Sequence, residues 1–181
     1  MKKLLFGLLL ITVGCQNSPK QSSSKPQTYF DLKGYVESQI AMLKKTNPVV
    51  RKEVSVNEES ETLVTPKIDW TKELELFLQA DINKPAYTQS YFIDTLSANT
   101  VSYRLRQGEH LPIQFLEVIR DEQNRPSKIK ATMLEKNYLF ESEKILTLES
   151  TDGRLSSYQI EGFQQLFIGD PKPFRITTLV Q

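Results

Sequence analysis

Residues 128–163 read KIKATMLEKNYLFESEKILTLESTDGRLSSYQIEGF, and this stretch decides the fold class. Its apolar residues largely recur at every second position, which is the period of a β-strand with two unlike faces. The pattern predicts strands at 128–136, 138–149 and 155–163. The breaks between them are only a few residues long, and Asp152-Gly153 is a typical hairpin turn. Connections this short require antiparallel pairing, because parallel strands need a long crossover.

The same period of two extends from residue 87 to near residue 180. Turn-forming residues interrupt it at Gln107-Gly108 and in the segments 121–126 and 170–173. The further strands that this pattern predicts are 87–96, 101–106, 113–120, a short one at 166–168, and 174–180. Together these strands make an antiparallel meander.

Two helices are predicted ahead of the meander. The first begins at residues 28–31, where Thr28 is expected to cap it and Asp31 follows three residues later. Four apolar residues then recur at helical spacing: Leu32, Val36, Ile40 and Leu43. Asn47-Pro48 is expected to end this helix.

Asp69 is expected to cap the second helix, and the segment 81–85 to end it. Its predicted buried stripe consists of Trp70, Leu74, Phe77 and Leu78. Between the helices, the alternating run 50–56 and the apolar pair Leu63-Val64 flank a polar turn and predict a hairpin. The fold class is therefore α+β, with two helices in the N-terminal half packed on a curved antiparallel β-meander of about six to eight strands.

The start of the chain has the features of a secretory signal peptide. The cations Lys2 and Lys3 precede an apolar run over residues 4–13, and a small residue, Gly14, precedes Cys15. A membrane-spanning helix needs about 20 apolar residues, so this run is too short to span as a permanent anchor. Cys15 is the single cysteine of the chain. We expect residues 1–14 to be removed.

The stretch Thr12-Val13-Gly14-Cys15 resembles the lipobox of bacterial lipoproteins. This resemblance implies that Cys15 is the lipid-attachment site, that it carries a diacylglyceryl group, and that the peptide is cut just before it. One departure is Thr12, where the family prefers Leu. The alternative is a secreted, unlipidated protein with a free cysteine. A lone thiol in an oxidising compartment invites intermolecular pairing, which favours lipidation.

Residues 15–27 follow as a Ser/Pro tether, and residues 28–181 have the length of a single domain. The layout resembles that of uncharacterised lipoproteins of Bacteroidota, in which a helix opening like the YFDLKGY of residues 29–35 follows the tether. In the sorting pattern of such proteins, a residue other than Asp after the cysteine implies the outer membrane. The absence of an acidic run in the tether favours the periplasmic side.

Composition excludes several classes of function. The formal net charge is +1 and includes Lys2 and Lys3, and no basic patch stands out, so we expect no nucleic-acid partner. The single histidine, His110, stands in a polar turn without a nucleophile motif, so we expect no catalytic residue. Neither a zinc pattern nor a phosphate loop occurs, and the acidic run 58–61 is interpreted as a solvated turn, so we expect no metal or cofactor.

Two further sets of residues have structural interpretations. Glutamates and lysines on neighbouring predicted strands are expected to form cross-strand ion pairs: Glu135, Glu141, Glu143 and Glu149 with Lys128, Lys130, Lys136 and Lys144. Aromatic residues are distributed through the predicted sheet: Tyr87, Tyr91, Phe92, Tyr103, Phe115, Tyr138, Phe140, Tyr158, Phe163 and Phe167. We expect them to pack in the core, the alternative being an apolar or glycan-binding groove.

Three functions follow from these observations. The leading one is a lipid-anchored, non-enzymatic binding or accessory module with an envelope protein as its partner. The second is a carrier of a lipid or other apolar ligand, because some strands are apolar on both faces and a curved sheet closed by two helices resembles lipid-binding half-barrels. The third is an envelope hydrolase, for which His110 would be the only available base.

Overall fold

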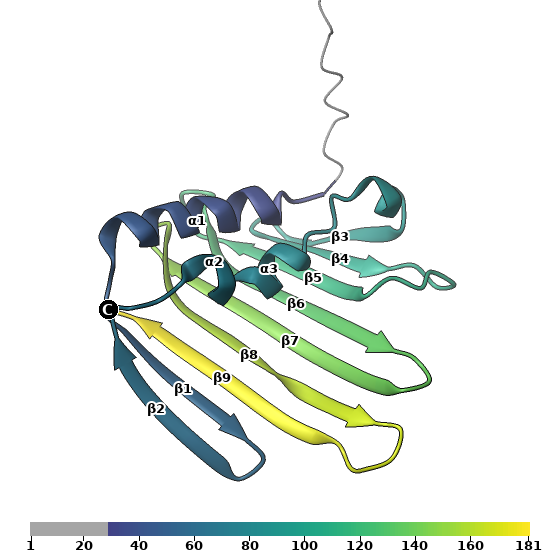
Figure 1. Ribbon diagram of the computed structural model, residues 1–181. Helices are drawn as coiled ribbons and strands as arrows, with labels where there is room; N and C mark the ends of the chain where they lie inside the picture. The colour runs from purple at the N-terminus through teal and green to yellow at the C-terminus, as the bar shows by residue number, and fades with distance from the viewer. Residues whose placement is uncertain (1–28) are drawn as a thin grey trace, which may run out of the picture.

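The computed structural model describes residues 29–181 (Figure 1). The predicted signal peptide (1–14), Cys15 and the predicted tether (15–27) lie outside the described residues. Three helical segments and a 3-10 turn accompany nine strands over this range. In chain order they are α1 (Leu32–Thr46), β1 (Val50–Val56), β2 (Glu59–Thr65), α2 (Trp70–Glu73), α3 (Glu75–Gln79), η1 (Pro85–Tyr87), β3 (Tyr91–Ser97), β4 (Thr100–Leu105), β5 (Ile113–Arg120), β6 (Pro126–Lys136), β7 (Phe140–Thr151), β8 (Arg154–Leu166) and β9 (Lys172–Val180).

Within residues 29–181 all nine strands belong to one antiparallel sheet with the order β2-β1-β9-β8-β7-β6-β5-β4-β3. Strands β3 to β9 form the predicted meander. The hairpin β1–β2 joins the same sheet because β1 pairs with β9 along its whole length, from Val50 opposite Val180 to Val56 opposite Phe174. The α+β class is confirmed. The sheet has nine strands rather than the expected six to eight because this early hairpin extends it.

Helix α1 begins three residues later than predicted. Its cap is Asp31, whose Oδ1 accepts a hydrogen bond from the Gly34 N–H at 2.9 Å, so the expectation that Thr28 caps the helix is wrong. The predicted end is confirmed, since Asn47 adopts a left-handed conformation (φ 45°) and its N–H donates to the Leu43 carbonyl at 2.8 Å.

The second predicted helix is present, but it is broken in two. Asp69 caps it as expected, accepting from the Thr71 and Lys72 N–H groups. At Leu74 the backbone leaves helical geometry (φ −99°, ψ 12°), and α3 starts afresh at the next residue. The break places the side chains of Trp70, Leu74 and Phe77 in the core, whereas Leu78 is only half-buried.

Two strand predictions are wrong, one in its start and the other as a separate strand. The strand expected over 87–96 starts at Tyr91, because Pro85 fixes its own φ and opens the 3-10 turn η1 instead. The separate strand expected at 166–168 does not form. Strand β8 continues to Leu166, and Phe167 and Ile168 lie in the turn before β9, where Gly169 has a φ of 136°.

The helices cover one face of the sheet, and the core lies between them (Figure 1). Leu116, Leu146 and Leu148 point to this face and are buried to 1% exposure or less. Burying an aliphatic side chain of this kind contributes roughly 1.5–3 kcal/mol. Two polar side chains tie α2 to the sheet, because Glu73 accepts hydrogen bonds from both Lys52 of β1 and Tyr158 of β8.

Candidate binding surface

The predicted site residues are placed as follows. Cys15 lies outside the described residues, so its lipidation stays a prediction. His110 lies exposed in the turn between β4 and β5, and among residues 29–181 its side chain takes part in no hydrogen bond. Its lack of a catalytic role stays a prediction too, testable by His110→Ala.

Of the acidic run 58–61, only Glu58 lies in the turn between β1 and β2, whereas residues 59–61 open strand β2, and all four are exposed. The interpretation as a turn is therefore wrong for residues 59–61. Over the part of the chain that the structure describes, no cluster of three or more His, Cys, Asp or Glu side chains is placed to hold a metal ion. In the same range no helix has the length and apolarity to cross a membrane.

The predicted cross-strand ion pairs are confirmed for three pairs on β6 and β7. Lys128 contacts Glu149 at 3.0 Å, Lys144 contacts Glu135 at 3.4 Å, and Lys136 contacts Glu141 at 2.5 Å. Each is worth roughly 0.2–1 kcal/mol. The hydrogen bond from Lys128 lowers the pKa of Glu149, which is the electrostatic signature of such a pair.

The aromatic residues divide into two groups. Tyr91, Tyr103 and Tyr158 are core residues, and burial raises the pKa of all three phenols. Tyr138 and Phe167, in contrast, are 85% and 73% exposed at the turns between β6 and β7 and between β8 and β9. The expectation of core packing is therefore wrong for these two residues, which follow the ends of their strands, and for Phe92, which is 49% exposed on β3.

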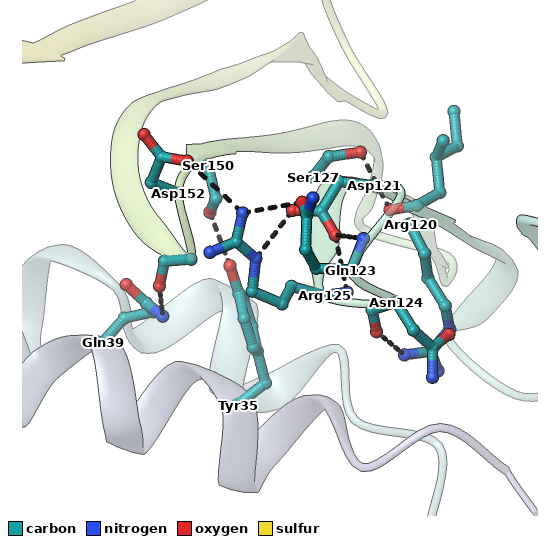
Figure 2. A network of polar contacts seen from close by, with 12 residues as sticks. Tyr35, Gln39, Arg120, Asp121, Gln123, Asn124, Arg125, Ser127, Ser150 and Asp152 are labelled. Atoms are coloured by element: carbon teal, nitrogen blue, oxygen red, sulfur yellow. Dashed lines mark hydrogen bonds and ion pairs between the residues drawn. The ribbon is translucent and has the colours of Figure 1, made fainter.

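A polar network links the turns at the α1 end of the sheet (Figure 2). Arg125, at the β5–β6 turn, donates to Asp121 at 2.7 Å and reaches Asp152 of the β7–β8 turn at 3.3 Å. Burial alone would raise the pKa of Asp121, but hydrogen bonds from Arg125 and the Gln123 N–H outweigh it, so the pKa is lowered. Asp121, Arg125 and Asp152 are thus joined by ion pairs that connect the two turns.

Helix α1 is tied to the same turns by two side chains. The Tyr35 hydroxyl lies 2.5 Å from Ser150 Oγ. The buried amide of Gln39 donates to the Gly153 carbonyl at 3.0 Å and accepts from the Leu155 N–H at 2.9 Å. Because these polar groups are hydrogen-bonded to one another, the network holds α1 against the turns, and none of these groups is left free for chemistry.

The helix-free face of the sheet carries a first hollow of about 410 Å³ over β7, β8, β9 and β1. Side chains alternate between the two faces along each strand. Because Leu146 and Leu148 of β7 point to the core, the residues next to them in the sequence point to the helix-free face, and the same holds on the neighbouring strands. The register places Ile145, Glu161, Arg175 and Ser55 side by side across the four strands. Arg175 Nε lies 3.0 Å from Glu161 Oε2, and this ion pair crosses the hollow.

A second hollow of about 320 Å³ lies further along the same strands, toward the α1 end. Thr147, Gln159 and Thr177 stand opposite one another in its floor. Ser157 and the Lys128–Glu149 ion pair border it. The two hollows lie on adjacent rows of one face. The first combines the Arg175–Glu161 ion pair with the apolar side chains of Ile145, Pro173 and Phe174, whereas hydroxyl, amide and paired charged groups dominate the second.

This surface suits a polar partner. Hydroxyl and amide groups both donate and accept hydrogen bonds, and they add no net charge. Sequence analysis did not single out Thr147, Gln159 or Thr177. The available signal was the opposite half of the alternation that predicted the core, since polar residues fill most of the alternate positions of β7 and β8 on this face.

A third cavity, of about 500 Å³, lies between the end of α1 and the β7–β8 hairpin. Met42, Leu43, Leu155 and Val180 give it a partly apolar wall. It lies at the end of the sheet, whereas the alternative that the sequence left open for an apolar ligand is a groove on the sheet. Along the sheet itself, the side chains of Trp70, Phe77 and Tyr158 fill the space between the helices and the strands.

Comparison with known proteins gives no relative: no family model, no curated protein and no solved structure matches this chain.

Proposed function

We propose that this chain is a lipid-anchored lipoprotein of the bacterial outer membrane, facing the periplasm, whose folded domain is a non-enzymatic binding module. The lipobox-like stretch before Cys15 supports the anchor. Each methylene buried in the bilayer contributes about 0.8 kcal/mol, so a cysteine with two or three acyl chains stays at the membrane.

The contrast between the two faces of the sheet carries the binding proposal. One face is packed under helices, whereas the other presents two adjoining hollows, the first crossed by the Arg175–Glu161 ion pair and the second lined mainly with hydroxyl and amide groups. We assign the partner to this helix-free face. Its chemistry favours a polar surface of another envelope component, recognised through hydrogen bonds.

Intact-mass measurement of the protein purified from its native membrane tests the anchor. We expect a chain that starts at Cys15 and carries the mass of the attached acyl groups. A bare amino terminus, or a chain with residues 1–14 still attached, would overturn the anchor.

A pair of matched variants tests the binding face. Gln159→Trp fills the second hollow, whereas Thr62→Trp adds the same side chain on the same face of β2, outside both hollows. In pull-downs from detergent-solubilised envelope, we expect a partner of fixed stoichiometry to be lost with Gln159→Trp and kept with Thr62→Trp. Equal recovery with both variants would remove the helix-free face from the proposal.

A second candidate is a carrier of an apolar ligand, and the third cavity favours it. Its volume falls within the range of about 300–1,000 Å³ that is typical of small-molecule sites. Native mass spectrometry of the untagged protein separates the two functions. A carrier retains a lipid-sized adduct that Met42→Trp displaces, whereas a binding module gives the mass of the chain and its anchor alone.

A further inference from the structure

Two neighbouring hairpins carry exposed apolar side chains at their tips. We call residues 138–139, between β6 and β7, and 166–168, at the end of β8, the apolar tips. Their exposed fractions are 85% for Tyr138, 50% for Leu139, 57% for Leu166, 73% for Phe167 and 74% for Ile168. Phe140 pairs with Leu166, so the two tips are adjacent. Such a concentration of exposed apolar residues marks an interaction site.

Several backbone groups at the tips are hydrogen-bonded to neighbouring residues of the tips. Asn137 Oδ1 accepts from the N–H groups of Leu139 and Phe140 at 2.8 and 3.1 Å, and the Asn137 N–H donates to the Phe140 carbonyl at 2.9 Å. The Phe167 N–H donates to the Leu139 carbonyl at 2.9 Å, which joins the two turns. Each of these bonds lowers the cost of contact with lipid, because a lipid environment offers no water to replace a missing hydrogen bond.

The shape of the tips distinguishes between occupants. Both hairpins reach past the helices at the end of the sheet that lies away from α1 (Figure 1). The tips protrude, so a protein partner would need a matching cavity, whereas a bilayer surface accepts projecting side chains directly. The flanking charges cancel, with Lys136 and Lys172 set against Glu141 and Asp170, so charge neither attracts the tips to the membrane nor repels them.

The segment between Cys15 and Tyr29 is long enough for an anchor at Cys15 and the apolar tips to contact the same membrane. Tyr29 packs on Tyr103, two strands from Ala131, and Tyr138 lies seven residues further along the chain from Ala131. At about 3.3 Å per residue and 4.8 Å per strand, Tyr29 and Tyr138 are roughly 25 Å apart. Residues 15–28 can span at most about 50 Å. An anchor at Cys15 therefore leaves the tips free to reach the same bilayer.

We propose that the apolar tips insert into the interfacial region of a lipid bilayer and give the domain a second membrane contact. The reach argument rests on the proposed anchor, whereas the exposure and hydrogen bonding of the tips do not. Two contacts, one through the tether and one through the hairpins, hold the domain in one orientation. The sheet then stands with its hairpin ends at the membrane and its α1 end away from it.

Photolabelling from the lipid tests this inference on the full chain. The protein, purified with its native amino terminus, is reconstituted into vesicles of phosphatidylethanolamine and phosphatidylglycerol that contain an acyl chain with a diazirine group. After illumination and digestion, mass spectrometry locates the label. We expect label on the peptides that contain residues 137–140 and 165–168, at the same level in low and high salt.

Variants identify the side chains responsible. Tyr138→Ser combined with Phe167→Ser should remove the label from both tips, with an unchanged circular dichroism spectrum and melting temperature. Leu96→Ser removes an apolar residue that is 61% exposed on β3, outside the tips, and should leave the labelling unchanged.

The possible results separate this inference from the proposed anchor. Label at the tips of a protein whose mass shows a bare amino terminus would support the inference and overturn the anchor. Label confined to the amino-terminal peptide would overturn the inference and leave the anchor standing. Unlabelled tips in a protein that is dimeric in detergent would identify a second copy of the chain as the occupant, which also overturns it.

Discussion

The two ends of the sheet use the same tight hairpins but differ in what surrounds them. At the α1 end, the β5–β6 and β7–β8 turns are joined to each other through Arg125 and to α1 through Tyr35 and Gln39. At the opposite end, the apolar tips carry exposed side chains and no helix covers them. Polar residues thus serve the fold at one end, and apolar residues are left outside the core at the other.

This difference assigns different roles to similar turns. Removing a side chain at the α1 end breaks hydrogen bonds within the fold, so it should lower the free energy of unfolding. Removing a side chain at the apolar tips deletes surface that the fold does not use. Four substitutions test this assignment, from the largest expected effect to the smallest.

Gly162, on β8 between the two ends, is expected to give the largest effect. A Cβ atom at this position would lie 1.9 Å from the Glu143 carbonyl oxygen of β7. Because the obstacle is backbone, Gly162→Ala should displace β8 from β7 and lower the free energy of unfolding by about 3 kcal/mol. Urea denaturation measures this loss, with Gln164→Ala on the same strand as the control. A normal midpoint would mean that the strands adjust without cost.

Gln39→Ala should have the next largest effect. It leaves the Gly153 carbonyl and the Leu155 N–H without their partner, and unsatisfied buried backbone groups cost about 1–3 kcal/mol. The control is Ser38→Ala on the exposed side of α1, with the same urea assay. If both variants unfold at the same midpoint, Gln39 does not hold α1 to the β7–β8 hairpin.

Asp121→Asn should have a smaller effect that depends on pH. The pKa of Asp121 is lowered in the folded protein, so its carboxylate stabilises the fold above the ordinary aspartate pKa of about 3.9. That contribution is lost as the pH falls through the lowered value. The variant should therefore be less stable than the wild type at pH 7, and the two should converge in acid. A difference that persists at low pH would point to packing instead.

Tyr138→Ser and Phe167→Ser are expected to change the free energy of unfolding least, by no more than about 0.5 kcal/mol. Both side chains are largely exposed, so little buried contact is lost. Thermal and urea unfolding of the protein in the absence of lipid provide the measurement. A loss as large as that of Gln39→Ala would make the tips part of the fold and erase the contrast between the two ends.

Much of the fold could be predicted because its signals are local. The alternation in residues 128–163 produced three adjacent strands, and Asp69 and Asn47-Pro48 marked helix boundaries that the structure confirms. The pairing of β1 with β9 could not be predicted, since it joins segments more than a hundred residues apart. The cap at Asp31 was missed because Thr28 and Asp31 are both good capping residues.

The candidate surfaces were harder to predict than the core. Thr147, Gln159 and Thr177 come together only through the register of β7, β8 and β9, which periodicity alone does not fix. Tyr138 and Phe167 belong to an apolar pattern that predicts burial. Their exposure depends on where each strand ends, which is set by Asn137 and by Gly169 with its positive φ. Whether these side chains are buried therefore depends on how the strands assemble into the sheet.

Because β9 lies inside the sheet, the sheet cannot close before β9 has been added. The last strand of the chain fills the gap between β8 and β1, so one edge of the early hairpin stays open until residues 172–180 have been synthesised. Closing contacts of such long sequence separation slows folding. We expect chains that stop before residue 172 to remain sensitive to protease, because β1 and β8 then lack the strand that pairs with both.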